Sequence, residues 1–248
     1  MILQNLTWQE VDALSREIVV VIPTGAVEQH GTHLPLVTDS LIAGRIAEEA
    51  EKRHSKDVLL TPCLWLGASA HHLGYSGTLS ADFPTYQGAI KSVIESLVPH
   101  GFRKFVVVNG HGGNIDPIGV ALRELKHTRE ELLLCNFCYF LQIQEQLAAI
   151  LDGPDKGMHH ADEAEASLVL HLSPQLVKKD KLRDDGLKPP VAGMVHNFKE
   201  LSEEGSIGYA SLATAEKGIR IFEAAVSALE TTILALASGY RLTAYPAK

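Results

Sequence analysis

The chain has 248 residues, of which 46% are hydrophobic and 21% charged, and its formal net charge is −8 at pH 7. These proportions are those of an ordinary globular protein and argue against disordered, fibrous and membrane-spanning classes. The net negative charge argues against nucleic acid as a partner, because binding a phosphate backbone requires many surface Lys and Arg side chains. The length suits one large core, so we expect residues 1–248 to form a single domain.

Residues 1–17 lack the basic segment and following apolar run of a signal peptide. The sequence also lacks a stretch of the roughly 20 apolar residues that a membrane helix requires. We therefore expect a cytoplasmic protein with no membrane partner. Cys63, Cys135 and Cys138 are an odd number of cysteines in a chain without an export signal, so a disulfide framework is not expected.

The predicted elements alternate between strands and helices along the chain. Strands are indicated by runs of β-branched and aliphatic residues at 17–23, 57–62, 103–109 and 131–140. Helical periodicity is found at 39–53, 85–100, 115–127, 160–171 and 214–238. Continuous apolar runs are typical of strands that are buried on both faces. The sequence therefore predicts an α/β fold, a three-layer α/β/α sandwich with a mainly parallel central sheet.

Two further features each have more than one interpretation. Cys135 and Cys138 form a C-x-x-C pattern, but they lie in the fourth predicted strand, where residues three apart point to opposite faces. We interpret them as buried small apolar residues rather than as a redox or zinc pair.

Segment 179–211 is rich in charged residues, Gly and Pro, including Pro189 and Pro190, and is predicted to be a functional lid or an oligomer contact.

Candidate metal ligands follow the first predicted strand. Glu28 and His30 lie in residues 24–35, TGAVEQHGTHLP, and Asp39 begins the next predicted helix. In an open parallel sheet the ligand site lies beyond the carboxyl ends of the strands. Residues two apart in extended chain share a face, so Glu28 and His30 are expected to point to the same space. Carboxylate and imidazole ligands suit Zn²⁺ or Mn²⁺.

The third predicted strand ends in residues 109–114, NGHGGN. The glycines around His111 permit positive φ and would bring its side chain close to a bulky group. A phosphate-binding loop is the alternative, but the sequence contains neither G-x-x-x-x-G-K-[ST] nor G-x-G-x-x-G. We therefore predict that His111 is a metal ligand.

The fourth group of candidates lies in residues 158–167, MHHADEAEAS, at the start of a predicted helix. His160 and Glu163 are three apart and would project to the same side of a helix. Acids in a first turn also stabilise the helix dipole, so Asp162 and Glu165 are equally open to a structural role. The remaining histidines considered are predicted to be surface or loop residues: His33, His54, His100, His127, His171 and His196.

The convergence of two glycine-bearing strand ends and one helix start on histidines and carboxylates is typical of a metal or catalytic site. With Asp39 shared between two sets of ligands, the site would hold two metal ions that activate a water molecule. The alternative from another class is a metal-free protein that binds a sugar or nucleotide in its glycine loops.

Three motifs resemble the creatininase, or creatinine amidohydrolase, superfamily. They are G-A-x-E-Q-H-G-x-H-L-P-x-x-T-D at 25–39, N-G-H-G-G-N at 109–114 and H-A-x-E-x-E-x-S at 160–167. Weaker similarity is found at 67–78 and 213–218. The resemblance extends over nearly the whole chain in the expected order and implies a creatininase-like fold.

The resemblance also implies a binuclear site that holds two divalent ions per chain, Zn²⁺, Mn²⁺ or Fe²⁺. Glu28, Asp39 and His111 would hold one ion, while His30 and the shared Asp39 would hold the other together with a further carboxylate. In creatininase that carboxylate lies two residues after the histidine of the third strand, where this chain has Gly113. Glu163 is therefore expected to take its place, and creatinine is not expected to be the substrate.

The implied activity is that of an amidohydrolase, in which a metal-bound hydroxide cleaves a non-peptide C–N bond of a cyclic amide, a formamide or a related small molecule. His160 would transfer a proton to the leaving nitrogen, with Glu163 beside it. The alternatives are hydrolysis of a keto-inositol or another strained ring carbonyl, and a non-catalytic member of the same fold that binds a small ligand or serves as a scaffold.

Substrate contacts and assembly are further expectations from the resemblance. Ser69 and Tyr75 are expected to contact the substrate. The chain departs from the family pattern at His71, Ser76, Asp162 and Ala166, and these positions are expected to affect specificity or turnover. The resemblance also suggests a closed homo-oligomer, a hexamer, with segment 179–211 as a contact.

Overall fold

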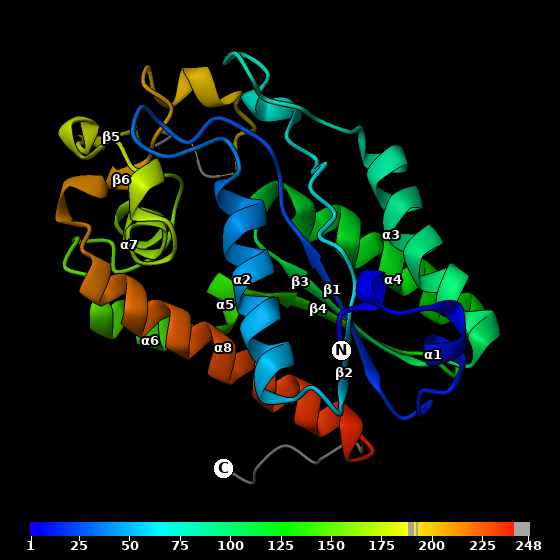
Figure 1. The fold of residues 1–248 in the computed structure, drawn as a ribbon. Helices are drawn as coiled ribbons and strands as arrows, with labels where there is room; N and C mark the ends of the chain where they lie inside the picture. Colours follow the sequence, from blue (N-terminus) through cyan, green and yellow to red (C-terminus); the bar gives the residue numbers. More distant parts are fainter. Residues whose placement is uncertain (188–190, 192, 241–248) are drawn as a thin grey trace, which may run out of the picture.

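The computed structural model describes residues 1–187, 191 and 193–240. Its centre is a four-stranded parallel sheet in the order β2-β1-β3-β4 (Figure 1). The strands are β1 (Val19–Thr24), β2 (Val58–Leu60), β3 (Lys104–Asn109) and β4 (Leu133–Cys138). All four predicted strands are therefore confirmed, and β1 and β3 lie side by side in the middle of the sheet.

Helices cover both faces of the sheet, which confirms the predicted three-layer α/β/α sandwich. Figure 1 shows α2, α7 and α8 on one side of the sheet and α3 and α4 on the other. The helices are α1 (Trp8–Asp12), α2 (Thr38–Arg53), α3 (Phe83–Leu97), α4 (Ile115–Thr128), α5 (Tyr139–Gln142), α6 (Gln144–Ile150), α7 (Glu163–Leu172) and α8 (Ala215–Ala237). Among the described residues, no helix is both long and apolar enough to cross a membrane.

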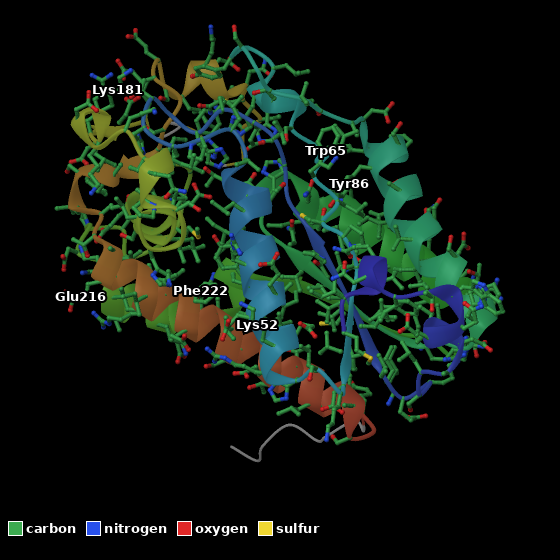
Figure 2. The ribbon with its side chains drawn as sticks, in the orientation of Figure 1. Lys52, Trp65, Tyr86, Lys181, Glu216 and Phe222 are labelled. Carbon is green, nitrogen blue, oxygen red and sulfur yellow. The ribbon has the colours of Figure 1, made fainter. Side chains whose placement is uncertain are left out.

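Each face of the sheet has its own hydrophobic core because successive side chains of a strand point to opposite faces. Val19 and Val21 belong to the core beneath α2, α7 and α8. Val20 and Ile22 belong to the core beneath α3 and α4. Figure 2 labels a residue from each core, Phe222 on α8 and Tyr86 on α3. Burial on both faces explains the uninterrupted apolar sequence of β1.

The structure differs from the predicted elements in three places. The helix predicted to begin at His160 begins at Glu163, because the side chain of Asp162 caps it. The short helices α1, α5 and α6 were not predicted. Strand β4 lies at the edge of the sheet, so its first four residues are half-buried rather than fully buried. Cys135 is half-buried and Cys138 is buried, and both are free thiols.

The described part of segment 179–211 lies over the carboxyl end of the sheet and is anchored by backbone hydrogen bonds (Figure 1). Gly31 N donates to Gly205 O at 3.0 Å, and Lys178 N, immediately before the segment, donates to His33 O at 2.9 Å. Two short strands, β5 (Asp184–Asp185) and β6 (Gly208–Tyr209), pair within it. The role of the segment as a lid or an oligomer contact stays a prediction, and its Pro189 and Pro190 lie outside the described residues.

Candidate metal centre

The site forms where β1 and β3 end next to each other. Thr24 is paired with Asn109 in the parallel register, so the loops that follow these residues meet at one edge of the sheet. The amino end of α2 comes close to both loops because two glycines leave room for it. A Cβ at Gly25 would lie 2.4 Å from Ser40 N, and a Cβ at Gly110 would lie 2.5 Å from Asp39 O. These close approaches bring Asp39 between the two loops.

One predicted group of ligands, Glu28, Asp39 and His111, comes together in the structure. His111 Nδ1 lies 3.2 Å from Glu28 Oε1 and 3.2 Å from Asp39 Oδ2. All three side chains are buried. Donor atoms about 2.0–2.2 Å from one tetrahedral ion lie about 3.3–3.5 Å from each other, so these separations suit a common Zn²⁺ ion.

A second group lies on the other side of Asp39. His30 Nε2 is 2.9 Å from Asp39 Oδ1 and 3.8 Å from Glu165 Oε1. His30, His160 and Glu165 together have ligand atoms within metal-binding reach of one another. Asp39 therefore presents one oxygen to each group, which is the arrangement expected of a carboxylate that bridges two ions.

The hydrogen bonding around these side chains fits cations in both positions. Both carboxylate oxygens of Glu28 and Oδ2 of Asp39 are buried without a hydrogen-bond partner among the described residues. His30 Nδ1 lies 3.1 Å from Glu28 O, and His111 Nε2 lies 3.3 Å from Ala68 O. When His30 Nδ1 and His111 Nε2 donate to these carbonyl oxygens, His30 Nε2 and His111 Nδ1 carry no hydrogen and face carboxylates. A cation between them satisfies both.

The electrostatics of the metal-free cluster lead to the same conclusion. Burial lowers the pKa of His111, but the carboxylates of Glu28 and Asp39 outweigh burial and raise this pKa to about 10. Burial likewise disfavours the charged form of His30. The carboxylates of Asp39 and Glu165 outweigh burial and raise the pKa of His30. Burial raises the pKa of Asp39, yet His30 and His111 lower it overall. The cluster therefore requires positive charge, whether protons or metal ions.

Glu163, the predicted replacement ligand, does not reach this cluster. Its Oε1 accepts hydrogen bonds from Asp152 N and Lys217 Nζ, and its Oε2 accepts one from Gly153 N. The prediction assumed that His160 and Glu163 share a helix, but His160 precedes α7 and pairs with Ile207 instead. Within α7, residues two apart are rotated by about 200°, so Glu165 faces His30 while Glu163 faces α8.

Three residues of the site were missed in the sequence or left open there. Glu165 stands beside His30 and had been left between a structural and a functional role. His72 Nε2 lies 3.4 Å from Glu28 Oε1, and Gln29 contacts both His72 and His160. The alternation of Glu163 and Glu165 in the sequence indicates that one of the two acids can face the site. For Gln29 and His72 the only sequence indication is their place in the motifs at 25–39 and 67–78. His33, predicted to be a surface or loop residue, lies in the loop between β1 and α2 but is buried, with its Nε2 2.9 Å from Ala161 O.

A cavity of about 280 Å³ opens onto the cluster. It is lined by Asp39, His71, His72, Gly110, His111, Gly112, Gly113, Phe140, Met158, His159, His160, Glu165, Phe198 and Ile207. Ser69 lies behind His111, with its Oγ 3.3 Å from Nε2 of that ring. Tyr75 donates its hydroxyl hydrogen to Ser202 O in segment 179–211. The two residues predicted to contact substrate therefore support the site from outside the cavity.

His160 lies between the cluster and the cavity. Its Nδ1 is 3.7 Å from Glu28 Oε1, and its Nε2 is 2.9 Å from Gln29 O. Burial lowers the pKa of His160 well below the usual range, and the neighbouring His30 and His72 lower it further. Burial also lowers the pKa of His72, to about 2. Both rings are therefore neutral at neutral pH, and each has one bare ring nitrogen that can accept a hydrogen bond.

The parallel α/β sandwich and its carboxylate–imidazole cluster define an α/β protein with a divalent-metal site. The chain belongs to the creatininase family, because the family model described as creatinine amidohydrolase matches residues 4–233. This confirms the family that the motifs indicated.

Relatives extend over most of the chain. A mycofactocin precursor peptide peptidase from Mycobacterium tuberculosis is 33% identical over 84% of this chain and 81% of its own length. A creatinine amidohydrolase from Pseudomonas putida is 29% identical over 92% of this chain and 94% of its own length. A crystal structure of creatinine amidohydrolase, 27% identical, covers 94% of this chain and 96% of that chain with a TM-score of 0.80. Solved creatininases at 27% identity include a Zn–Zn type and a Mn form.

Proposed function

We propose that this chain is a binuclear metal-dependent amidohydrolase that cleaves a C–N bond of a cyclic amide or formamide. The observation that carries the proposal is Asp39, which presents Oδ1 to His30 and Oδ2 to His111. Glu28 completes the group around His111, and Glu165 completes the group around His30. Zn²⁺ and Mn²⁺ both suit these ligands.

When bound, the two ions lower the pKa of a water molecule and polarise the substrate carbonyl. His160 is placed to move the proton. Its Nδ1 faces the cluster, 3.7 Å from Glu28 Oε1, and would carry the proton from the cluster to the leaving nitrogen. The ring of Phe198 lies 4.6 Å from that of His160 and limits access of bulk water. Since position 113 is glycine, the second ion depends on Glu165.

A second candidate is cleavage of a short peptide by the same chemistry. It is favoured by the 33% identity to the mycofactocin precursor peptide peptidase. Hydrolysis of a keto-inositol is the alternative within the same fold. The cavity is lined by histidines, glycines, apolar side chains and the carboxylates of Asp39 and Glu165, and this lining does not favour a keto-inositol over an amide.

Elemental analysis and a substrate panel test the proposal. The protein purified with Zn²⁺ or Mn²⁺ should contain close to two ions per chain and hydrolyse one class among cyclic amides, formamides and short peptides. Chelation should abolish turnover, and restoring the ion should recover it. Asp39→Ala should lose most of both ions because it removes a ligand from each. Protein that takes up no divalent ion when Zn²⁺ and Mn²⁺ are supplied would refute the proposal.

A further inference from the structure

Gln29 lies between two metal ligands in the sequence, and its own side chain is directed at two histidines. It is 5% exposed. Gly31 N donates a hydrogen bond to Oε1 at 3.0 Å, which identifies the other terminal atom as the amide nitrogen. That nitrogen lies 2.8 Å from His72 Nδ1 and 3.0 Å from His160 Nε2. An amide nitrogen carries two hydrogens, so one group can serve both rings.

The contact with His72 selects the tautomer of that ring. A neutral imidazole that accepts a hydrogen bond at Nδ1 carries its proton on Nε2. His72 Nε2 lies 3.4 Å from Glu28 Oε1. Gln29 thus holds His72 in the tautomer that carries its proton on Nε2, the nitrogen nearer Glu28.

His160 Nε2 meets two different groups of the same residue. It is 2.9 Å from the carbonyl oxygen of Gln29 and 3.0 Å from the side-chain nitrogen. The carbonyl accepts when Nε2 carries a proton, and the amide donates when Nε2 is bare. Either tautomer is therefore hydrogen-bonded while the ring stays in place, with Nδ1 directed at the cluster.

Phe198 and Gly205, in the described part of segment 179–211, lie against this arrangement. The ring of Phe198 stacks on that of His72 with centroids 4.3 Å apart. Gly205 has φ of +86°, and a Cβ there would lie 1.9 Å from Gln29 Oε1. Only glycine therefore fits over the amide, and the segment holds Gln29 against the two rings.

We infer that Gln29 is a positioning residue that holds His160 through both its carbonyl and its side-chain amide, and holds His72 through the same amide. The hydrogen bonds can be tested directly, whereas the predicted effect on rate rests on the proposed function. Two measurements therefore separate failure of this inference from failure of the proposed function.

The first measurement is NMR of ¹⁵N-histidine-labelled, Zn²⁺-loaded protein. Gln29→Leu removes the side-chain amide but keeps the carbonyl and the approximate volume. The imidazole ¹⁵N signals of His72 and His160, assigned from His72→Ala and His160→Ala spectra, should shift, while those of His30 and His111 and the Zn²⁺ content stay as in the wild type. Unchanged His72 and His160 signals in a folded variant would overturn the inference whether or not the protein is an enzyme.

The second measurement is a double-mutant cycle on kcat with the substrate found in the panel. Gln29→Leu should lower kcat about 10- to 100-fold, the usual effect of losing a residue that supports a metal-site group. In the His160→Ala background the same change should lower kcat less than about 2-fold, because the positioned ring is gone. An equal loss in both backgrounds would mean that Gln29 acts independently of His160.

Gly205→Ala provides an independent test from the other side of the amide. It should shift the His72 and His160 signals as Gln29→Leu does, because the new methyl group displaces Gln29 Oε1. Gly239→Ala is the matched control, since Gly239 has φ of +88° and open space around it. Shifts of equal size in both variants would show that backbone strain, rather than Gln29, is responsible.

Discussion

At the scale of single residues, the two acids at the start of α7 have different tasks. Glu165 Oε1 faces His30, whereas Glu163 binds Lys217 and the backbone of the loop at 152–153. Glu165→Gln should lower the metal content to about one ion per chain, because a neutral amide is a weaker ligand. Glu163→Gln should keep both ions and lower the free energy of unfolding by about 1–3 kcal/mol through lost hydrogen bonds. Elemental analysis and urea unfolding check both; the reverse pattern of metal loss would restore Glu163 as the ligand.

The space around Gly113 is too small for a side chain. A Cβ would lie 2.4 Å from Ala68 O, 2.5 Å from His111 Nε2 and 2.9 Å from His71 Cε1. Gly113→Glu should therefore displace His111 and lower Zn²⁺ affinity at least 10-fold, measured by competition with a chelator. Gly112→Ala is the control because its Cβ would meet nothing within 4 Å. Zn²⁺ binding that strengthens in Gly113→Glu would contradict the expectation.

The raised pKa of His111 makes metal binding depend on pH. In the metal-free protein this pKa is about 10, so His111 is protonated at pH 7.5 and must lose that proton to bind an ion at Nδ1. Zn²⁺ binding at pH 7.5 should release at least one proton per chain, measured by calorimetry in buffers of different ionisation enthalpy. Because the pKa of His111 is higher in the folded than in the unfolded protein, its protonation stabilises the folded, metal-free protein. This contribution to the free energy of unfolding is complete below about pH 6.5 and is lost as the pH rises towards 10. Proton uptake would contradict this.

At the scale of elements, the cap of α7 sets the direction of Glu165. Asp162 Oδ1 accepts hydrogen bonds from Ala164 N and Glu165 N, and its Oδ2 accepts one from His159 N. Asp162→Ala should lower the free energy of unfolding by about 0.5–2 kcal/mol, and it should also weaken binding of the second ion. Asp162→Asn, which keeps an acceptor, should lose less. Urea unfolding and metal titration measure both effects, and equal losses in the two variants would argue against a capping role.

At the scale of the whole molecule, we propose a closed homo-oligomer, a hexamer. The surface exposes large apolar side chains, among them Trp65, Leu79 and Phe83, with exposed fractions of 50%, 46% and 57%. Figure 2 shows Trp65 beside α3, where it lines a pocket with Tyr86 and Ala89. Light scattering at micromolar concentration should give a mass near six chains, and Trp65→Glu should lower it if this surface is buried between copies. A monomeric mass would refute the proposal.

The sequence by itself determined the sheet and most of the candidate ligands. Apolar runs at 19–23 and 105–108 identify β1 and β3, because burial on both faces confines polar residues to the strand ends. Glu28, His30, Asp39 and His111 follow from these strand ends, since the parallel order places the ends at one edge. The sequence was sufficient to predict these four residues because each lies close along the chain to the strand or helix that positions it.

Only the tertiary structure decided which acid of α7 belongs to the site. Spacing from His160 favoured Glu163, but the cap at Asp162 starts the helix after His160 and turns Glu165 towards His30. The roles of His72 and Gln29 depend on contacts across more than 40 residues of chain. Such contacts arise from packing of loops that are distant in the sequence, and no local periodicity or capping signal encodes them.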